Sequence, residues 1–396
     1  MTVRTEVRSV VHITSWAGAA GFGVGTVVRE LSTAQSELGM GMKVWSTDTN
    51  ADRPDGLGDG VIWTRFPTCG PSRLAWAPAM MKMARADDRP ATIHQHGIWT
   101  AVSSVTRFLH EQRGVPSVIA PHGSLQDWAL HKSRMRKALA LRLYERENLF
   151  NCSCLHALSA TELADCRAFG LRNPIAIIPN GVSEQWLASS GDGPAFRSEH
   201  HIDEAHILLY LSRVTPKKGL PMLCQAIAEI GDRMRGWVLV IAGPDEFDHM
   251  AELVELIGRL GLEHSVQFVG SLYGADNRDA IAAADAFVLP SYSEGLPMAV
   301  LEAMGLGLPV VVTDATQIAE IGQESCGWRV PADRSSLADA LVELSKCSDD
   351  ELLLMGQNGK RFVASRYTWQ QVARMTLELY GWLSGDTWRP SFVVDG

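Results

Sequence analysis

The chain has 396 residues, 46% of them hydrophobic and 20% charged, and a formal net charge of −9 at pH 7. This length exceeds what one hydrophobic core usually supports, so two domains are expected. The composition is typical of globular proteins, and the negative charge argues against a general nucleic-acid binder. No apolar run approaches the roughly 20 residues that a transmembrane helix needs.

Cysteine usage and the start of the chain indicate the compartment. The chain carries 7 cysteines, an odd number that fits reduced thiols rather than a disulfide framework. Arg4, Glu6 and Arg8 stand where a secretion signal would have an apolar run. We therefore expect a cytoplasmic protein, at most peripheral on the inner face of the cytoplasmic membrane.

The first half alternates short β-rich runs with helical patterns. Residues 10–14 have the pattern of a strand, and a glycine-rich loop follows, with glycines at 18, 21, 23 and 25. The apolar positions 27, 28, 31 and 38 then mark one face of a helix. Such alternation predicts a parallel sheet with helices on both faces. Further strands are expected at 43–45, 61–64, 92–95, 117–120, 154–158 and 175–178.

The glycine-rich loop, which includes Gly21 and Gly23, would let backbone N–H groups approach a ligand closely. Its glycines do not have the G-x-G-x-x-G spacing, and no acidic residue ends the second strand where a ribose would bind. These departures argue against a nicotinamide-dinucleotide site.

Histidines follow two strands of the first half. His122 comes directly after the strand 117–120, so we expect it to point into a cleft between the domains. His94 and His96 are two residues apart and face the same side of a strand. No carboxylate or cysteine completes a metal set with them, which favours a hydrogen-bonding role. Another group, Cys152, Cys154 and His156, is better explained by core packing than by metal binding.

The second half repeats the strand–helix scheme, with continuous apolar strands expected at 207–211, 238–242, 266–269, 286–289 and 308–313. Residues 179–182 and the polar stretch 189–199 separate the halves and are interpreted as a linker. The tail 368–383 has a helical pattern. The prediction is an α/β protein with two Rossmann-like domains facing each other across a cleft. The first spans 1–186, with the helix 368–386 packed back on it, and the second spans 187–367.

Glu294 and Glu302 are the most informative pair in the second half. Pro297 suits the first turn of a helix, which places Glu294 in the preceding loop and Glu302 about one turn into the helix. The free N–H groups and the dipole at such a helix start bind phosphate. Carboxylates on either side of that site can accept hydrogen bonds from sugar hydroxyls. The alternative is a solvated helix face, on which the same spacing also occurs.

Two basic residues come after the strand 207–211. Arg213 and Lys218 would both lie at the carboxyl end of this strand, where a guanidinium and an ammonium can hold a diphosphate. The alternative is a solvated basic loop. After the next strand, Gly243-Pro244 adds a tight turn on the same edge.

Together these motifs resemble the retaining glycosyltransferases of family 4, the group 1 glycosyltransferases, which have the GT-B fold. The group includes bacterial mannosyl-, glucosyl- and galactosyltransferases. The similarity covers nearly the whole chain, and the basic pair with the Glu-x7-Glu pair is its most specific part. The other markers are the glycine-rich loop and the segments 96–99, 121–124, 179–182 and 212–219.

The resemblance implies a nucleotide-diphosphate sugar donor held mainly by the second domain and an acceptor that enters from the first. It assigns His122 and Glu294 to the sugar ring and Glu302 to the ribose hydroxyls. Arg213 and Lys218 would neutralise the diphosphate, with Lys217 as a competitor for Lys218. Backbone N–H groups would complete the phosphate site, from Gly295, Leu296 and Met298 and from the loop with Gly21 and Gly23.

No cofactor and no metal are expected. Cleavage of the sugar–phosphate bond leaves negative charge on the diphosphate, and preorganised positive groups lower that barrier. No Asp-x-Asp motif stands at a strand end to hold a divalent ion there, and Arg213, Lys218 and the helix dipole can serve instead. Alternatives are a nucleotide-sugar epimerase or phosphorylase on the same scaffold, or a binding homologue without catalysis. An epimerase would need further carboxylates, and intact site residues argue against a binding homologue.

A basic helical stretch lies between Trp128 and Phe150. Lys132, Arg136, Arg142 and Arg146 fall within roughly 120° of arc on a helix, interleaved with Met135, Leu139 and Leu143. Such a face suits an anionic membrane surface, and the acceptor would then be a lipid-linked saccharide of polysaccharide or lipopolysaccharide assembly. The alternative is a solvated helix that pairs with Glu145 and Glu147.

Overall fold

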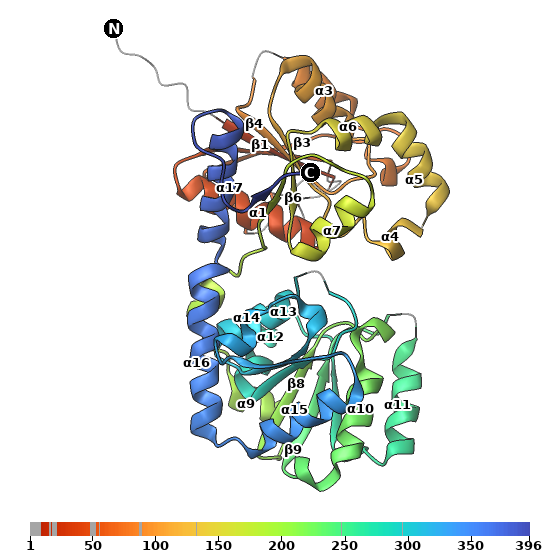
Figure 1. The fold of residues 1–396 in the computed structure, drawn as a ribbon, viewed down its shortest axis with the longest axis vertical. Coiled ribbons are helices and arrows are strands. Elements are labelled where there is room, and N and C mark those ends of the chain that lie inside the picture. The colour runs from red at the N-terminus through yellow and green to blue at the C-terminus, as the bar shows by residue number, and fades with distance from the viewer. Residues whose placement is uncertain are drawn as a thin grey trace. The chain divides into compact units, whose positions relative to one another are not determined.

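The computed structural model describes residues 9–15, 17, 22–47, 53–54, 56–86, 89–131, 133–246, 248–294 and 296–396. The chain divides into two compact units. The first comprises residues 1–181 and 369–396, and the second residues 182–368. Each unit contains a mainly parallel sheet flanked by helices, as the strand–helix alternation predicts (Figure 1).

The sheet of the first unit has the strand order β14-β7-β6-β5-β4-β1-β2-β3. All neighbouring strands are parallel except β14, which pairs antiparallel with β7. The chain reverses its direction of winding between β1 and β4, which makes their carboxyl ends the switch point of this sheet. The strands are β1 Ser9–Thr14, β2 Gly41–Ser46, β3 Val61–Arg65, β4 Thr92–His96, β5 Ser117–Ala120, β6 Cys154–Ala157, β7 Ile175–Ile177 and β14 Val393–Val394.

The C-terminal helix α17, Trp369–Leu383, belongs to this first unit and packs on α1, Phe22–Glu37. Val28 and Leu31 of α1 share one buried core with Val372 and Leu379 of α17. The other helices are α2 Pro78–Arg85, α3 Ser103–Arg113, α4 Asp127–His131, α5 Arg134–Ala140, a π-helical turn Leu141–Glu145, α6 Arg146–Asn151 and α7 Ala160–Ala168.

The sheet of the second unit has the order β10-β9-β8-β11-β12-β13, with its switch point between β8 and β11. Its central strands are buried on both faces, which is why they are continuous apolar runs in the sequence. The strands are β8 His206–Leu211, β9 Trp237–Ala242, β10 Val266–Gly270, β11 Ala286–Leu289, β12 Val310–Thr313 and β13 Gly327–Val330.

Helices cover this second sheet, and they include a segment that the sequence suggested was a linker. Residues 193–199 form helix α9, which starts after Asp192, whose side chain accepts a hydrogen bond from the N–H of Ala195. Phe196 of this helix is part of the buried core, so the linker interpretation was wrong here. The helices are α8 Glu184–Ala188, α9 Gly193–Glu199, α10 Leu220–Ile230, α11 His249–Leu260, α12 Ala275–Ala283, α13 Met298–Gly305, α14 Glu320–Gln323, α15 Arg334–Lys346 and α16 Asp349–Arg366.

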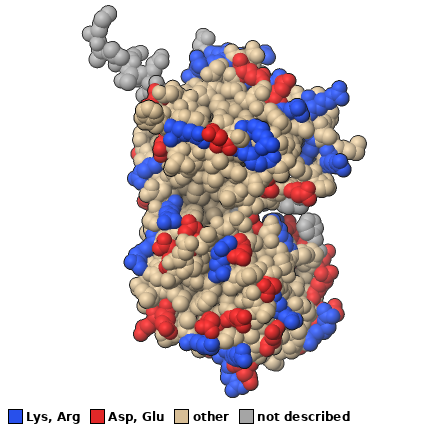
Figure 2. All heavy atoms as spheres, in the orientation of Figure 1, with Lys and Arg blue, Asp and Glu red and all other residues tan. Residues whose placement is uncertain are grey.

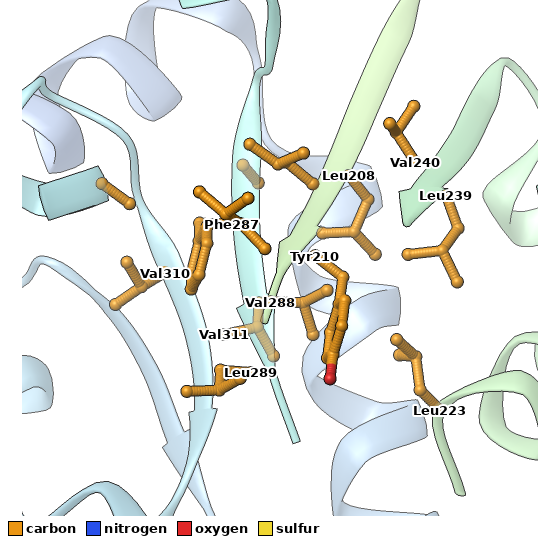
Figure 3. Close-up of a cluster of buried hydrophobic side chains, with 14 of the residues drawn as sticks. Leu208, Tyr210, Leu223, Leu239, Val240, Phe287, Val288, Leu289, Val310 and Val311 are labelled. Carbon is orange, nitrogen blue, oxygen red and sulfur yellow. The ribbon is translucent and has the colours of Figure 1, made fainter. Parts of the chain in front are cut away.

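The core of the second unit fixes the start of a loop that carries predicted site residues. The Tyr210 ring lies among buried aliphatic side chains that include Leu208, Val288 and Leu223 (Figure 3). Its hydroxyl donates a hydrogen bond to the carbonyl oxygen of Arg213 at 2.8 Å. The hydrophobic core therefore holds the backbone of the loop that follows β8.

On the face of the molecule shown in Figure 2, acidic and basic side chains are interspersed over both units. Within the described residues, none of the helices combines the length and the hydrophobicity that crossing a bilayer requires.

Candidate functional site

The carboxyl ends of β8 and β11, at the switch point of the second sheet, bring two predicted residues together. Nζ of Lys218, after β8, lies 2.7 Å from Oε1 of Glu294, after β11. The two side chains are only 13% and 9% exposed. Oε1 of Glu294 also accepts a hydrogen bond from the Ser291 hydroxyl. A partly buried ion pair thus stands where open α/β sheets bind their ligands.

Glycine at position 219 makes this approach possible. Gly219 has φ +73°, and a Cβ there would lie 2.0 Å from the carbonyl oxygen of Pro290. The backbone after β8 therefore touches the backbone after β11, and the N–H of Tyr292 donates to the carbonyl of Lys217 at 2.9 Å. Of the two adjacent lysines, it is Lys218 whose ammonium reaches Glu294.

Arg213, the other predicted cation, is bound by a carboxylate that the sequence analysis did not single out. Its Nη1 lies 2.9 Å from both Oε1 and Oε2 of Glu246, and the Arg213 side chain is 60% exposed. The loops after β8 and β9 run side by side, since the N–H of Val214 donates to the carbonyl oxygen of Pro244 at 2.9 Å and the N–H of Glu246 donates to the carbonyl oxygen of Val214 at 3.2 Å. At Gly243, a Cβ would lie 1.9 Å from the carbonyl oxygen of Ser212. Arg213 and Lys218 are therefore each neutralised by a different glutamate.

Glu302 lies on α13, about one turn after the helix begins. The helix starts at Met298 with Pro297 as its N-cap, one residue later than expected, and Leu296 precedes the cap. Burial raises the pKa of the Glu302 carboxyl to about 7, because water that would solvate the anion is excluded. A carboxyl that is protonated near neutral pH can donate as well as accept a hydrogen bond. Gly295 lies outside the described residues.

The predicted glycine-rich loop is partly helical. Gly21 lies outside the described residues, and α1 already begins at Phe22. Gly23 and Gly25 are therefore in the first turn of a helix, which corrects the loop assignment at these two positions. The N–H groups of a first helical turn have no partner within the helix, so Gly23 can still contribute a donor to a ligand.

In the first unit, His122 occupies a tight turn directly after β5. Its φ is +51°, and Gly123 follows with φ +73°. The carboxylate of Glu162 on α7 holds this turn, because it accepts hydrogen bonds from the N–H of Gly123 at 2.6 Å and of Leu158 at 2.7 Å. Glu162 was missed, although the Ser159-x-x-Glu162 pattern at a helix start could have drawn attention to it.

Four buried histidines and the partly exposed His122 form a cluster at that turn. His12 Nδ1 lies 2.8 Å from His96 Nε2, and His96 Nδ1 lies 3.1 Å from His122 Nε2. His156 Nδ1 lies 3.2 Å from His94 Nε2. The hydrogen-bonding role expected for His94 and His96 is therefore observed, and His12 and His156 join them.

Three of these rings have the spacing of a metal site. One nitrogen each of His12, His94 and His96 lies within 4.8 Å of the others. However, both ring nitrogens of all three already have a hydrogen-bond partner, in the cluster or at Gln35 and Tyr380. A metal ion would have to replace several of these hydrogen bonds.

Burial keeps the histidine cluster uncharged. It lowers the pKa of His12 and His156 to about 4 and that of His122 to about 3, because an imidazolium loses its hydration there. The pKa values of His94 and His96 are also lowered well below the ordinary value, by burial first and by their histidine neighbours second.

A second buried carboxylate of the first unit corrects the interpretation of the basic helix. Glu145, in the π-helical turn, is fully buried and accepts hydrogen bonds from the N–H of Trp99 at 2.7 Å and from the Ser103 hydroxyl at 2.9 Å. It is therefore not a surface partner of the nearby arginines. Glu147 instead pairs with Arg107 of α3.

Family models match both units of the chain. A model described as "Glycosyl transferase 4-like domain" matches residues 22–181, and one described as "Glycosyl transferases group 1" matches residues 205–347. The second match contains the Lys218–Glu294 pair, Arg213 and Glu302.

Several proteins similar to this chain are named as mannosyltransferases. The chain is 26% identical to the GDP-mannose:cellobiosyl-diphosphopolyprenol alpha-mannosyltransferase of Xanthomonas oryzae, over 81% of each chain. It is 28% identical to the GDP-mannose-dependent alpha-(1-6)-phosphatidylinositol monomannoside mannosyltransferase of Mycobacterium tuberculosis, over 55% of this chain and 58% of the relative. The chain spans only about half the length of some curated relatives that it matches.

Solved structures extend the comparison to the whole fold. The Anabaena protein HepE, crystallised with UDP and glucose, superposes with a TM-score of 0.70 at 18% identity and covers 94% of this chain and 99% of its own. At this identity the likeness shows the fold alone, which is the two-domain GT-B architecture.

Proposed function

Both units of the chain match glycosyltransferase family models, and from this premise we propose that the protein is a retaining hexosyltransferase that uses a nucleotide-diphosphate sugar. The acceptor in this proposal is a lipid-linked saccharide, and the pathway is bacterial polysaccharide or lipopolysaccharide assembly. Relatives named for GDP-mannose donors and for a diphosphopolyprenol acceptor support this choice.

The observation that carries the proposal is the Lys218–Glu294 pair at the switch point between β8 and β11. The ammonium of Lys218 lies 2.7 Å from the carboxylate of Glu294, and both groups are largely shielded from water. A diphosphate and the hydroxyls of the attached sugar would therefore find binding partners side by side. Lys218 attracts the departing diphosphate, and Glu294 accepts hydrogen bonds from the hexose hydroxyls.

The remaining residues extend the donor site along the same sheet edge. Arg213 supplies a second cation for the diphosphate. To do so, its guanidinium gives up its contact with Glu246. In this proposal Glu302 on α13 holds the ribose hydroxyls. The N–H of Leu296, just before the cap, and that of Met298, the first residue of α13, bind the phosphates. In the first unit, His122 is the proposed sugar contact.

A panel of nucleotide sugars tests the proposal. Purified protein is incubated with GDP-mannose, UDP-glucose, UDP-galactose and their free nucleotides, while its melting temperature and the release of nucleotide are followed. We expect one donor to raise the melting temperature and to be hydrolysed slowly without acceptor. Product from a matching acceptor should keep the anomeric configuration of the donor. An absence of both stabilisation and hydrolysis across the panel would contradict the proposal.

We further propose that α5 and the following turn rest on an anionic membrane surface. Met135, Leu139 and Leu143 are 88%, 59% and 62% exposed, which is unusual for apolar side chains on one helical stripe. Exposed arginines flank them, and none forms an ion pair with a described carboxylate; they are Arg134, Arg136, Arg142 and Arg146. Lys and Arg side chains are also visible on this side of the first unit in Figure 2. Lys132 lies outside the described residues.

Liposome sedimentation distinguishes this surface from a solvated helix. The wild-type protein should bind vesicles with anionic lipid at low salt and dissociate as salt rises. Replacing Arg136, Arg142 and Arg146 by Gln should abolish binding. A matched triple variant of exposed cations in the second unit, Arg233, Arg259 and Lys360, should bind like the wild type. If the wild-type protein ignores these vesicles, a soluble acceptor becomes the better hypothesis.

A further inference from the structure

A continuous chain of hydrogen bonds connects helix α17 to His122 within the first unit. It runs from Thr376 through Gln35, His12 and His96 to His122, and we call these five residues the relay. The contacts are 2.7 Å from Gln35 Nε2 to Thr376 Oγ1, 2.7 Å from His12 to Gln35 Oε1, 2.8 Å from His12 to His96 and 3.1 Å from His96 to His122. The first four side chains are at most 2% exposed.

One backbone carbonyl determines the direction of the first bond. The Thr376 hydroxyl donates its proton to the carbonyl oxygen of Ala373 at 2.9 Å. Towards Gln35 the hydroxyl can therefore only accept, so the amide nitrogen of Gln35 must face Thr376. The amide oxygen of Gln35 then faces His12, and an amide oxygen can only accept.

That orientation propagates through three neutral rings. His12 must carry its proton on Nε2 to donate to Gln35, which leaves Nδ1 as an acceptor. His96 must then donate from Nε2 to His12 and accept at Nδ1. His122 therefore donates from Nε2 to His96, and its Nδ1 has no proton. This Nδ1 forms no hydrogen bond with any residue that the structure describes.

A second branch fixes the same orientation of Gln35 independently. His156 Nε2 donates to the carbonyl oxygen of Ile178 at 2.8 Å, so His156 Nδ1 accepts from His94. His94 Nδ1 must then accept the proton of the Tyr380 hydroxyl, 2.6 Å away. The Tyr380 oxygen is left to accept from Gln35 Nε2 at 3.3 Å. Both branches thus require the amide nitrogen of Gln35 on the side of α17.

We propose that the relay fixes His122 in the tautomer with its proton on Nε2 and presents Nδ1 as an acceptor for a substrate hydroxyl. Gln35, His12, His96 and Thr376 are positioning residues, since they act through His122. The tautomer follows from the hydrogen bonds of the first unit alone, whereas the hydroxyl ligand rests on the proposed function. If Gln35 were rotated by half a turn, all three rings would reverse and Nδ1 of His122 would become a donor.

Nitrogen NMR of the full-length protein labelled in histidine tests the tautomer without any substrate. The His122 signals are assigned by comparison with a His122→Asn variant. We expect the wild type to show an unprotonated Nδ1 and a protonated Nε2 on His122. Gln35→Met removes the acceptor of His12, and it should give His122 a mixed or reversed tautomer. A wild-type His122 with its proton on Nδ1, or an unchanged tautomer in folded Gln35→Met, would overturn the relay.

The matched control is Tyr380→Phe, which removes a buried hydroxyl from the second branch and leaves the relay intact. It should keep the wild-type tautomer, because Thr376 still orients Gln35. The double variant Thr376→Val, Tyr380→Phe removes both constraints without touching Gln35 or a histidine. The double variant should give His122 a mixed or reversed tautomer. It serves as the test if Gln35→Met does not fold. A mixed or reversed His122 tautomer in the single Tyr380→Phe variant would contradict the statement that Thr376 alone can orient Gln35.

Kinetics then test the role in catalysis. Gln35→Met should lower kcat about fivefold, the factor typical of one hydrogen bond, with KM for the donor little changed. Tyr380→Phe should retain kcat. A changed tautomer with unchanged kcat would leave the relay standing and remove His122 from the proposed function. Stoichiometric zinc binding that perturbs His12, His94 and His96 would instead show a metal site and contradict the relay.

Discussion

The two units hold their candidate site residues by opposite physical means. In the first unit, His122 is bound by a neutral hydrogen-bonded cluster whose pKa values burial lowers. In the second unit, Lys218 and Arg213 are bound by carboxylates, at 2.7 Å from Glu294 and 2.9 Å from Glu246. A neutral network fixes the direction of each hydrogen bond, whereas an ion pair fixes position and charge.

The difference matters for what each unit can do. A ligand with negative charge can compete for Lys218 and Arg213, because phosphate offers the same kind of oxygen as the glutamates. The histidine cluster has no charge to exchange and offers a hydroxyl an oriented acceptor. Substitutions in the second unit should therefore change transfer most, and those in the first unit should change pH dependence.

The largest effect is expected for Glu294→Gln. This change keeps the shape of the side chain but removes the charge that holds Lys218 and the strong acceptor for sugar hydroxyls. Transfer should fall by about two orders of magnitude or more while the fold stays intact. Steady-state kinetics and a melting curve check both parts. Near-wild-type turnover would remove Glu294 from the site.

Arg213→Ala should come next, with transfer reduced by about a hundredfold through loss of a cation at the diphosphate.

The partner variant Glu246→Gln sharpens the comparison, since it frees Arg213 from its bidentate contact. Because the Arg213–Glu246 ion pair is exposed, it contributes only about 0–1 kcal/mol of interaction free energy. Its loss should therefore lower KM for the donor by no more than about fivefold. An increase of KM in Glu246→Gln would mean that the glutamate supports the arginine rather than competing for it.

Acid should weaken the first unit before the second. The folded pKa values of His12 and His156 are about 4, below the ordinary 6.5, so the unfolded chain binds more protons between these values. The contribution of these two histidines to the stability of the first unit is therefore complete above about pH 6.5 and is lost as the pH falls towards 4. Hydrogen exchange, corrected for its intrinsic pH dependence, should show this loss in β1 and β6, which carry His12 and His156. Parallel loss of protection in both units would contradict it.

The smallest effect is expected from chelation. Transfer should survive excess EDTA, since Lys218 and Arg213 supply the positive charge at the diphosphate in the proposed function. The assay is repeated with magnesium or manganese added back. Loss of activity on chelation that either ion restores would show that the cations of the second unit do not suffice.

Much of this arrangement follows from local sequence patterns. Continuous apolar runs predicted nearly every strand, because burial on both faces leaves a strong signal. The strand β13, Gly327–Val330, was not predicted, because none of its residues is buried and the sequence therefore shows no apolar run there. The strand β14 was missed because it has only two residues.

The partners of the candidate residues could not be predicted in this way. Glu246 meets Arg213 only because two loops run side by side, and His12 meets His96 across two strands that lie far apart in sequence. The alternative of a solvated basic helix placed Glu145 on the surface, yet a π-helical turn buries it. Patterns along the chain identify single residues, but such pairings depend on tertiary structure. The roles of the site residues in transfer remain predictions.

Calorimetric binding of free UDP and GDP is the most direct measurement of the donor site, with the wild type, Lys218→Met and Glu294→Gln compared. The account predicts that one nucleotide binds the wild type, that Lys218→Met weakens it by about tenfold or more, and that Glu294→Gln binds it almost as well. Lys360→Met, an exposed change on α16, serves as the control for lost charge. Equal affinity in the wild type and a folded Lys218→Met would contradict a diphosphate site at the switch point of the second sheet.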